Sequence, residues 1–290
     1  MDRILLIEQT LNALQLGVML FLMAAGLTLV LGIMNFINLA HGVFYMLGAY
    51  FAATIYHMTG SFVIAALGAP LATALIGVAA ELLVLRHVIA RPPLDQVLCT
   101  VGLILFFNNL VRIIWGPLPL FLPVPDALKE GIELLPGLSY PAIRLAIIVA
   151  GLAVAVMLYV LIHKTRTGML IRAGASNRMM VSTMGVNISL LFTAVFGLGC
   201  AMAGFAGTMA GPIMAVRSGM GDEILILTLV VIVIGGIGSI RGAFVAALLV
   251  GAIDTFGRIT LPASMGDIGI YVLMALVLFW RPKGLFPAHG

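Results

Sequence analysis

The stretch LNALQLGVMLFLMAAGLTLVLGI, residues 11–33, contains no Asp, Glu, Lys, Arg or His. An α-helix needs roughly 20 apolar residues to cross the ~30 Å hydrocarbon core of a bilayer. Only helices and closed β-barrels satisfy their own backbone hydrogen bonds in lipid, and the alternating polarity of barrel strands is absent from this sequence. The stretch therefore predicts a transmembrane helix.

The rest of the chain has the same apolar character. Of the 290 residues, 62% are hydrophobic and 9% are charged, whereas soluble domains carry roughly 25% charged residues. Further apolar segments lie at 36–57, 62–85, 96–114, 142–162, 188–213, 224–237, 243–257 and 268–280. The last three are short, and the pair around GGIGSIRG (235–242) is read either as two spans or as one broken, re-entrant element. We expect an all-α polytopic transmembrane helix bundle of 8–10 spans, with residues 1–290 forming one domain.

Basic residues set the expected orientation, because Lys and Arg are retained on the cytoplasmic side of a membrane. They follow the third, fifth and last apolar segments, which is consistent by parity of crossing. These residues are Arg86, Arg91, Lys164, Arg166, Arg172, Arg178, Arg281 and Lys283. The acidic residues Asp126, Glu130, Glu133, Asp222, Glu223 and Asp267 then fall outside. The C-terminus is expected to be cytoplasmic.

The one sizeable outer loop, at about 115–140, is rich in proline. It contains Pro117, Pro119, Pro123, Pro125 and Pro136. Proline fixes φ and removes a backbone donor, so this loop is expected to be a stiff, extended surface and not a helix. It is either a connector or part of a docking surface for an external protein.

The basic segment RTGMLIRAGASNRMMVSTMGVN (166–187) lies between two apolar runs and contains three arginines and no acidic residue. Ser176 is a plausible N-cap and Gly185 a plausible C′ residue, so they bracket a short interfacial helix containing Met180 and Met184. Asn187 can cap the span that follows. Composition leaves three interpretations open: a loop attracted to anionic headgroups, a signalling target helix, or a docking helix for a cytoplasmic motor.

Polar residues inside the spans are the candidates for a solute route, because a polar group at membrane depth usually faces the bundle interior or a cavity. Asn35, Asn38 and His41 recur at i, i+3 and i+6, which places them on one face if the stretch is helical. Gly42 follows at once, and Asn108 lies in the fourth segment. The alternative for these residues is a structural role as hydrogen-bonding groups between helices.

A weak internal repeat in the sequence supports the interpretation of these residues as a solute route. HGVFYMLGAY, which begins at His41, and RGAFVAALLVGA, which begins at Arg241, share a basic residue, then glycine, a small residue and phenylalanine. Each follows a stretch rich in helix breakers or amides. Interrupted apolar segments in corresponding halves point to the binding region of a transporter, so Gly242 joins the candidate route. Chance similarity is the alternative.

The sequence offers no chemistry of its own for ATP or for catalysis. No G-x-x-x-x-G-K-[ST] phosphate loop occurs, and no H-E-x-x-H, C-x-x-C or G-x-S-x-G is present. The chain is therefore not expected to be an enzyme, to hold a cofactor or a metal, or to bind ATP itself. An ion-coupled secondary carrier remains open, in which Asp254 or His41 would titrate during transport.

Three ordered motifs identify a resemblance that covers nearly the whole chain. RAGASNRMMVSTMGVNISLLFTAVFGLGCAMAGFAGTMAGPI (172–213), GIMNFINLAHGVFYMLGAY (32–50) and RPKGLF (281–286) are similar to the coupling, second-span and closing motifs of permease subunits of bacterial branched-chain amino acid ABC importers. Ser182 and Thr183 depart from that pattern, in which alanine is usual. The related pentose permeases lack the NFINLAHG motif.

The resemblance implies a function and a set of partners. The segment 173–185, within a coupling loop at about 163–187, would be a helix that inserts into an ATP-binding subunit. ATPase coupling would then involve Arg172, Ala173, Asn177, Met180, Met184 and Gly185. The implied partners are a second homologous permease, two ATP-binding subunits, an external or periplasmic substrate-binding protein and the bacterial inner membrane, with no nucleic acid. Leucine, isoleucine and valine are the default substrates, and relatives handle other amino acids, amides, urea or aromatic acids.

Overall fold

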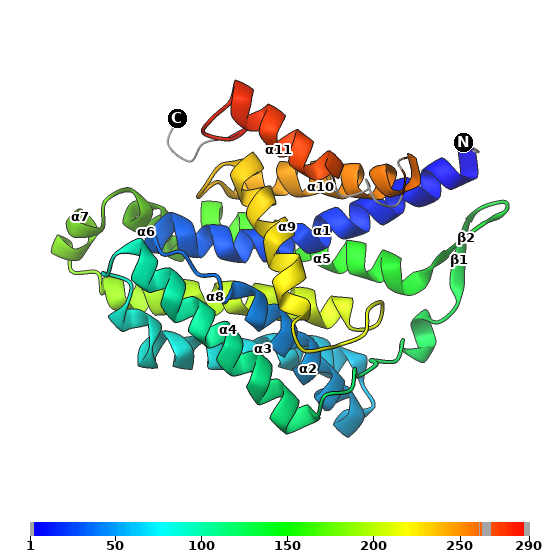
Figure 1. Cartoon of the computed structure of the whole chain (residues 1–290), viewed down its shortest axis with the longest axis horizontal. Coiled ribbons are helices and arrows are strands. Elements are labelled where there is room, and N and C mark those ends of the chain that lie inside the picture. Colours follow the sequence, from blue (N-terminus) through cyan, green and yellow to red (C-terminus); the bar gives the residue numbers. More distant parts are fainter. Residues whose placement is uncertain (1–2, 261, 263–267, 287–290) are drawn as a thin grey trace.

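The computed structural model describes residues 3–260, 262 and 268–286, so Asp267 lies outside the described residues. Several helices run along the longest axis of the molecule, and others, such as the yellow helix in the middle of the view, cross them (Figure 1). They are α1 (Arg3–Met34), α2 (His41–Thr59), α3 (Phe62–Leu83), α4 (Pro93–Trp115), α5 (Ala142–Lys164), α6 (Arg166–Ser176), α7 (Arg178–Thr183), α8 (Ile188–Ala210), α9 (Met220–Gly235), α10 (Ile240–Thr260) and α11 (Ile268–Trp280), with 3₁₀ turns η1 (Leu85–His87) and η2 (Asp126–Leu128). The chain is an all-α polytopic bundle, as predicted.

Six helices are long and apolar enough to cross a membrane: α1, α3 with its 3₁₀ extension, α4, α5, α8 and α10. The predicted limits agree closely for several of them, for example 142–162 against Ala142–Lys164. α2, α9 and α11 are shorter, with 19, 16 and 13 residues. The exact number of crossings therefore stays a prediction.

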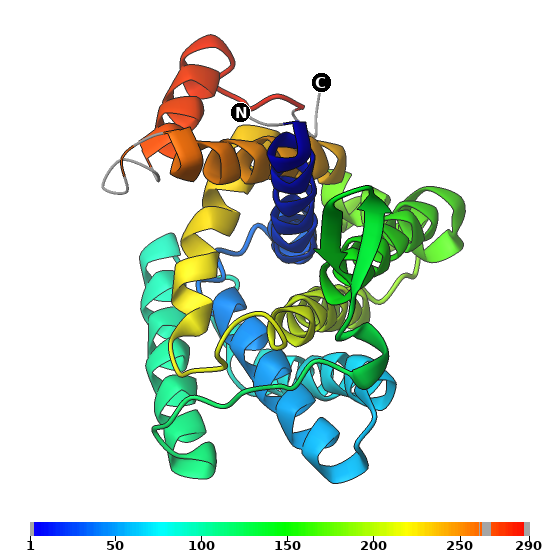
Figure 2. The same ribbon diagram turned by 90° about the vertical axis from the view of Figure 1, so that its right-hand side faces the viewer.

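The core is built around α1. Every residue from Val18 to Val30 is buried, because α5, α8, α9 and α10 all pack against this helix. Figure 2 shows α1 end-on with those helices around it. A helix that is apolar on all sides suits such a central position.

The outer loop contains structure that the sequence did not predict. β1 (Gly131–Leu135) and β2 (Leu138–Pro141) form an antiparallel hairpin whose register pairs Ile132 with Tyr140. Upstream, the backbone of Leu120 exchanges two hydrogen bonds with Val216 in the α8–α9 connection, both 2.9 Å long. The loop is extended as expected, and its two short strands do not change the all-α class of the chain. The hairpin lies at the opposite end of the molecule from α6 and α7 (Figure 1).

A buried acidic residue stabilises the contact between α3 and α8. Glu81, whose side chain is 2% exposed, pairs with Arg86 at 3.3 Å and accepts a 2.8 Å hydrogen bond from Thr193 Oγ1. The Glu81 carboxylate is therefore both buried and paired. A carboxylate buried among apolar helices is tolerated only while it is paired.

We expect Arg86→Gln to destabilise the chain by about 3 kcal/mol, because it leaves the Glu81 carboxylate buried without its counter-ion. Adding Glu81→Gln should restore most of that loss. Arg217→Gln is the matched control, since Arg217 and its partner Glu223 are both exposed and surface pairs contribute about 1 kcal/mol or less. Thermal unfolding in detergent measures all four proteins, and equal losses for Arg86→Gln and Arg217→Gln would contradict the prediction.

Candidate functional site

The stretch between α1 and α2 is an interruption and not a helix. Asn35 adopts φ +47°, a left-handed conformation that ends α1, and residues 35–40 are non-helical before α2 begins at His41. The backbone N–H of Ile37 donates to Gln96 Oε1 at 3.2 Å, so a residue of α4 holds the interruption in place. The prediction that Asn35, Asn38 and His41 share one helix face was therefore wrong.

The interruption instead separates these side chains. Asn35 is exposed, whereas Asn38 is 1% and His41 0% exposed. Among the described residues, neither the Asn38 amide nor the His41 ring has a hydrogen-bond partner. The backbone of Met23 is near the His41 ring, but without the geometry of a hydrogen bond. An unsatisfied buried polar group costs about 1–3 kcal/mol, so these two side chains weaken the resting fold.

Two of the candidate route residues meet the first turn of α9. Gly42 packs against Gly221 so closely that a Cβ added at Gly42 would lie 2.2 Å from the Gly221 carbonyl oxygen. Asn108 of α4 accepts a hydrogen bond from the backbone N–H of Gly219 at 3.1 Å, and its amide donates to Asp222 at 3.4 Å. Asn108 thus ties α4 to the start of α9.

Gly242 meets the other end of the same helix. A Cβ at Gly242 would lie 2.0 Å from the carbonyl oxygen of Gly235, the last residue of α9. The internal repeat that relates His41-Gly42 to Arg241-Gly242 therefore has a structural counterpart, because each glycine lies near the start of a helix and packs on a glycine of α9. No pattern in the sequence indicated that α9 was the common partner.

The closing motif, residues 281–286, also contacts α9. The backbone N–H of Leu285 donates to Ile234 O at 2.8 Å, and that of Phe286 donates to Gly235 O at 3.0 Å. The last carbonyls of a helix have no partner within it, so this C-terminal segment satisfies two of them. Residues 281–286 thereby fix the end of α9 and the turn that leads into α10.

The basic segment forms two helices joined at Asn177. Its side chain accepts a 3.0 Å hydrogen bond from Met180 N, so Asn177 and not Ser176 is the N-cap of α7; Ser176 is the last residue of α6. Both are good capping residues, and the backbone turns one residue later than predicted. Gly185 has φ +84° and follows the C-cap Met184, as predicted, and Asn187 caps α8.

α7 projects from the bundle and exposes methionines. Met179, Met180 and Met184 are 80%, 63% and 78% exposed, while Val181 on the opposite face is buried. Exposed flexible methionines are typical of surfaces that adapt to a protein partner. At the start of α7, the Arg178 guanidinium lies 5.3 Å from the centre of the Phe192 ring in α8. This contact attaches α7 to the bundle.

The start of the segment is held to α5. The Arg172 guanidinium donates to the carbonyl of Ile162, and a Cβ at Gly168 would lie 2.2 Å from the Leu161 carbonyl oxygen. The carbonyl of Ala173 accepts from Asn177 N at 2.9 Å. α6 is therefore packed against the bundle while α7 extends beyond it.

Arg172 and Asn35, assigned to different roles from the sequence, line one cavity of about 1150 Å³. Thr28, Ser239 and Arg241 line it too, and sequence reasoning missed all three as site residues. Gln96 was missed as well, and so was Ser218, whose hydroxyl donates to Asn108 O at 3.1 Å. The GGIGSIRG motif contains Ser239 and marked this turn as unusual. For Thr28 and Gln96 the sequence carried no signal.

Comparison with known proteins gives consistent results. A family model described as "Branched-chain amino acid transport system / permease component" matches residues 9–278. The high-affinity branched-chain amino acid transport system permease protein BraD of Pseudomonas aeruginosa is 29% identical, over 96% of this chain and 95% of that protein. The corresponding LivH of Escherichia coli is 29% identical over 96% and 94%, and a probable LivH of Methanocaldococcus jannaschii is 26% identical over 44% and 43%. No solved structure matches the chain.

Proposed function

Because the chain belongs to the family of branched-chain amino acid transport system permease components, we propose that it is the membrane-spanning subunit of an ATP-driven importer for branched-chain or related amino acids. The observation that carries this proposal beyond family membership is α7, a capped helix that projects three exposed methionines from a bundle otherwise built for lipid. A projecting apolar helix needs a protein partner, and an ATP-binding subunit is the partner that this transport requires.

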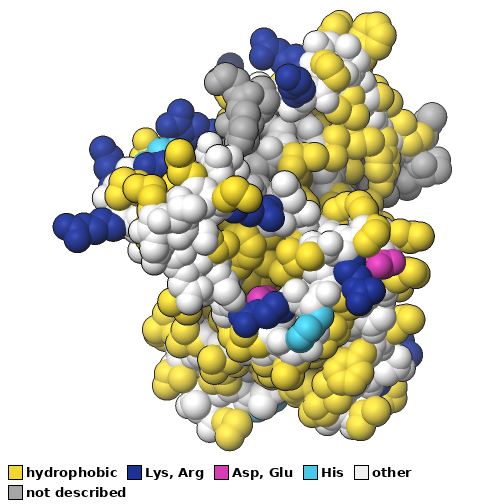
Figure 3. All heavy atoms as spheres, turned by 90° about the vertical axis from the view of Figure 1, so that its left-hand side faces the viewer, with side chains coloured by type: hydrophobic (Ala, Val, Ile, Leu, Met, Phe, Trp, Pro, Cys, Tyr) yellow, Lys and Arg dark blue, Asp and Glu magenta, His cyan; other side chains and the backbone are white. Residues whose placement is uncertain are grey.

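The distribution of charge supports a bacterial inner-membrane orientation with α7 in the cytoplasm. Lys and Arg side chains gather over the end of the molecule that carries α6 and α7 (Figure 3), while Glu130 and Glu133 flank or lie on the hairpin at the other end. Cytoplasmic surfaces of membrane proteins carry the excess of Lys and Arg. The C-terminal segment 281–286, which packs on the end of α9, is then cytoplasmic as well.

The geometry suggests how partner motion would reach the spans. α6 packs against α5 and α1, and α7 is attached to α8 through Arg178 and Phe192. When two ATP-binding subunits close, displacement of α7 would pull on α6 and α8 together. Both of these helices pack against the central α1, whose end leads directly into the interruption at Asn35.

The solute route is proposed to pass the interruption. Asn38 and His41 offer amide and imidazole groups that are unpaired in the resting structure, as a transient site for a zwitterion would require. A second permease subunit would complete the route, and an external binding protein would deliver the substrate. Specificity among leucine, isoleucine, valine and other amino acids would lie mainly with that binding protein.

The alternative is an ion-coupled carrier that uses Asp254. This carboxylate accepts hydrogen bonds from Arg258 Nε at 3.0 Å to both oxygens, and its side chain is 8% exposed. Arg258 Nη2 also lies 3.0 Å from Asp254 Oδ1, so the carboxylate has a counter-ion one turn along its own helix. Asp254 is therefore better explained as one partner of a structural pair, which favours the importer.

Co-purification tests the proposed function. The chain is extracted gently from bacterial membranes, and its stoichiometric partners are identified by mass spectrometry while leucine uptake is measured in vesicles. We expect a second permease and ATP-binding subunits, and uptake that stops when ATP is removed. Recovery of the chain alone, with uptake that collapses when the proton gradient is dissipated at constant ATP, would establish the carrier.

Asn38→Leu should separate a structural role from a transport role. Because the Asn38 amide is buried without a partner, an apolar side chain of similar size should leave the thermal stability unchanged or raise it by about 1 kcal/mol. Uptake should fall at least tenfold if the amide contacts the solute. Asn109→Leu is the control, since this exposed amide donates to the backbone carbonyl of Leu105, one turn earlier in the same helix. Lower stability together with normal uptake would show that Asn38 is structural.

A further inference from the structure

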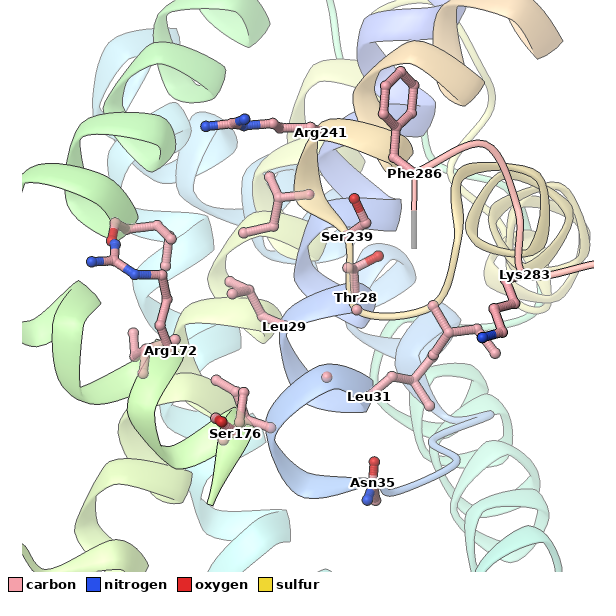
Figure 4. Close-up of a pocket in the computed structure, with 18 of the residues that line it drawn as sticks. Thr28, Leu29, Leu31, Asn35, Arg172, Ser176, Ser239, Arg241, Lys283 and Phe286 are labelled. Atoms are coloured by element: carbon pink, nitrogen blue, oxygen red, sulfur yellow. The ribbon is translucent and has the colours of Figure 1, made fainter. Parts of the chain in front are cut away.

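The cavity of about 1150 Å³ between α1, α6, α10 and the C-terminal segment is lined by three cationic residues from three different elements. Arg172 comes from α6, Arg241 from α10, and Lys283 from the segment after α11. Figure 4 shows the three residues on separate sides of the cavity, with Thr28 and Ser239 near its centre. None of the lining residues is acidic, so the cavity has a net positive charge.

Two of these cations have no partner within the described part of the chain. Among the residues that the structure describes, the side chains of Arg241 and Lys283 make no hydrogen bond or ion pair, and both residues are exposed at the mouth of the cavity. Arg172 donates only to the carbonyl of Ile162, which leaves its charge uncompensated. Three cations held around one space repel each other unless an anion lies between them.

The wall of the cavity offers a further unpaired group. Thr28 is 1% exposed, it lines the cavity, and its hydroxyl is one of the buried polar atoms without a hydrogen-bond partner. Ser239 lies across from it on the turn into α10, where its hydroxyl accepts from Gly242 N at 3.1 Å and keeps its own proton free to donate. The cavity thus combines positive charge with hydroxyl donors, as a phosphate group requires.

Apart from Asn35, His163 and Ser176, the remaining walls are mostly apolar. They include Leu29, Leu31, Ile171, Val233, Leu285 and Phe286. A small free anion would leave these side chains and most of the volume without a ligand, whereas a molecule with an anionic head and hydrocarbon tails would use both. Basic pockets between transmembrane helices on the cytoplasmic side are the sites that bind the headgroups of acidic lipids.

We propose that this cavity binds one acidic glycerophospholipid, with its phosphate held by Arg172, Arg241 and Lys283 and an acyl chain along the apolar wall. The lipid links α6 to the turn between α9 and α10 and to the C-terminal segment, three elements that meet around the cavity. It therefore stabilises the base of the projecting α6–α7 segment. The site does not depend on the proposed function, because it requires only that the chain is embedded in a membrane.

Lipid titration of the full chain tests this proposal. The chain is purified in a neutral detergent, delipidated, and titrated with phosphatidylglycerol, phosphatidylcholine or inorganic phosphate, and bound molecules are counted by native mass spectrometry. We expect one phosphatidylglycerol per chain, bound at least tenfold more tightly than phosphatidylcholine. The Arg241→Gln/Lys283→Gln variant should bind it about 25-fold more weakly, since each surface cation contributes about fivefold to anionic lipid binding.

The matched control removes two other cations from the same end of the molecule. Arg91 and Arg166 are exposed and do not line the cavity, so Arg91→Gln/Arg166→Gln should change the affinity for phosphatidylglycerol by less than twofold. Equal losses in the two double variants would mean diffuse surface attraction and would overturn the site. The proposal would also be overturned if the unsubstituted chain bound phosphatidylglycerol and phosphatidylcholine equally tightly.

Inorganic phosphate distinguishes a lipid from a soluble ligand. If millimolar phosphate displaces phosphatidylglycerol completely, the occupant is a soluble phosphate compound and the lipid assignment is wrong. Thermal unfolding of the unsubstituted chain provides a measurement that needs no variant: phosphatidylglycerol should raise the unfolding midpoint by several degrees and phosphatidylcholine should not. The absence of any difference between the lipids would refute the proposal even if a variant failed to fold.

Discussion

Gly48→Ala is expected to destabilise the chain by about 3 kcal/mol and to lower the amount of folded protein recovered from the membrane several-fold. A Cβ at Gly48 of α2 would lie 2.2 Å from the carbonyl oxygen and 2.4 Å from the Cα of Gly204 in α8. Both atoms belong to the backbone, so no side-chain rotation relieves the contact and the two helices must separate. α2 and α8 also touch where Gly207 faces the Tyr45 carbonyl, and that contact would be lost as well.

The control for this prediction is Gly102→Ala in α4, where nothing lies within 4 Å of an added Cβ. In both helices alanine has the higher helix propensity, by about 1 kcal/mol. Gly102→Ala should therefore be neutral or slightly stabilising, and only the close approach distinguishes the two positions. Fluorescence-detected size exclusion measures the folded fraction, and a normal monodisperse peak for Gly48→Ala would show that α2 and α8 are not in this close contact.

Hydrophobic runs predicted the helices because length and apolarity directly decide what can cross a bilayer. The fourth segment, 96–114, matches α4 (Pro93–Trp115), and the segment that begins at 188 matches the start of α8. Caps were predictable to within one residue, because Ser176 and Asn177 are adjacent residues with similar capping ability. Local chemistry was sufficient for these features.

Features that depend on distant partners were not predictable. The interruption at 35–40 overlaps the start of the segment predicted at 36–57, and it is held by Gln96 on another helix. The hairpin was hidden because proline dominates the loop, although its strands follow after η2. The sequence also singled out Gly42 and Gly242, but it could not reveal that both pack on α9, since close backbone approach leaves no periodic signal.

Substitution of one exposed methionine should abolish partner binding without affecting the fold. Met184 is 78% exposed at the end of α7, so Met184→Glu places a charge on the proposed ATPase-facing surface while touching nothing in the bundle. A desolvated charge without a partner in an interface costs several kcal/mol, and we expect association with the ATP-binding subunits to weaken more than 100-fold and uptake to stop. Pull-down of the complex from detergent extracts measures the association.

Met58→Glu is the matched control. Met58 is 80% exposed near the end of α2, which is proposed to lie on the outer side of the membrane, so the same change in charge, size and exposure occurs away from α7. Its folded yield should equal that of Met184→Glu, and its association with the ATP-binding subunits should be normal. If Met184→Glu retained its partners, α7 would not be the coupling helix, because a charge at the end of its exposed methionine surface cannot be accommodated in a tight protein interface.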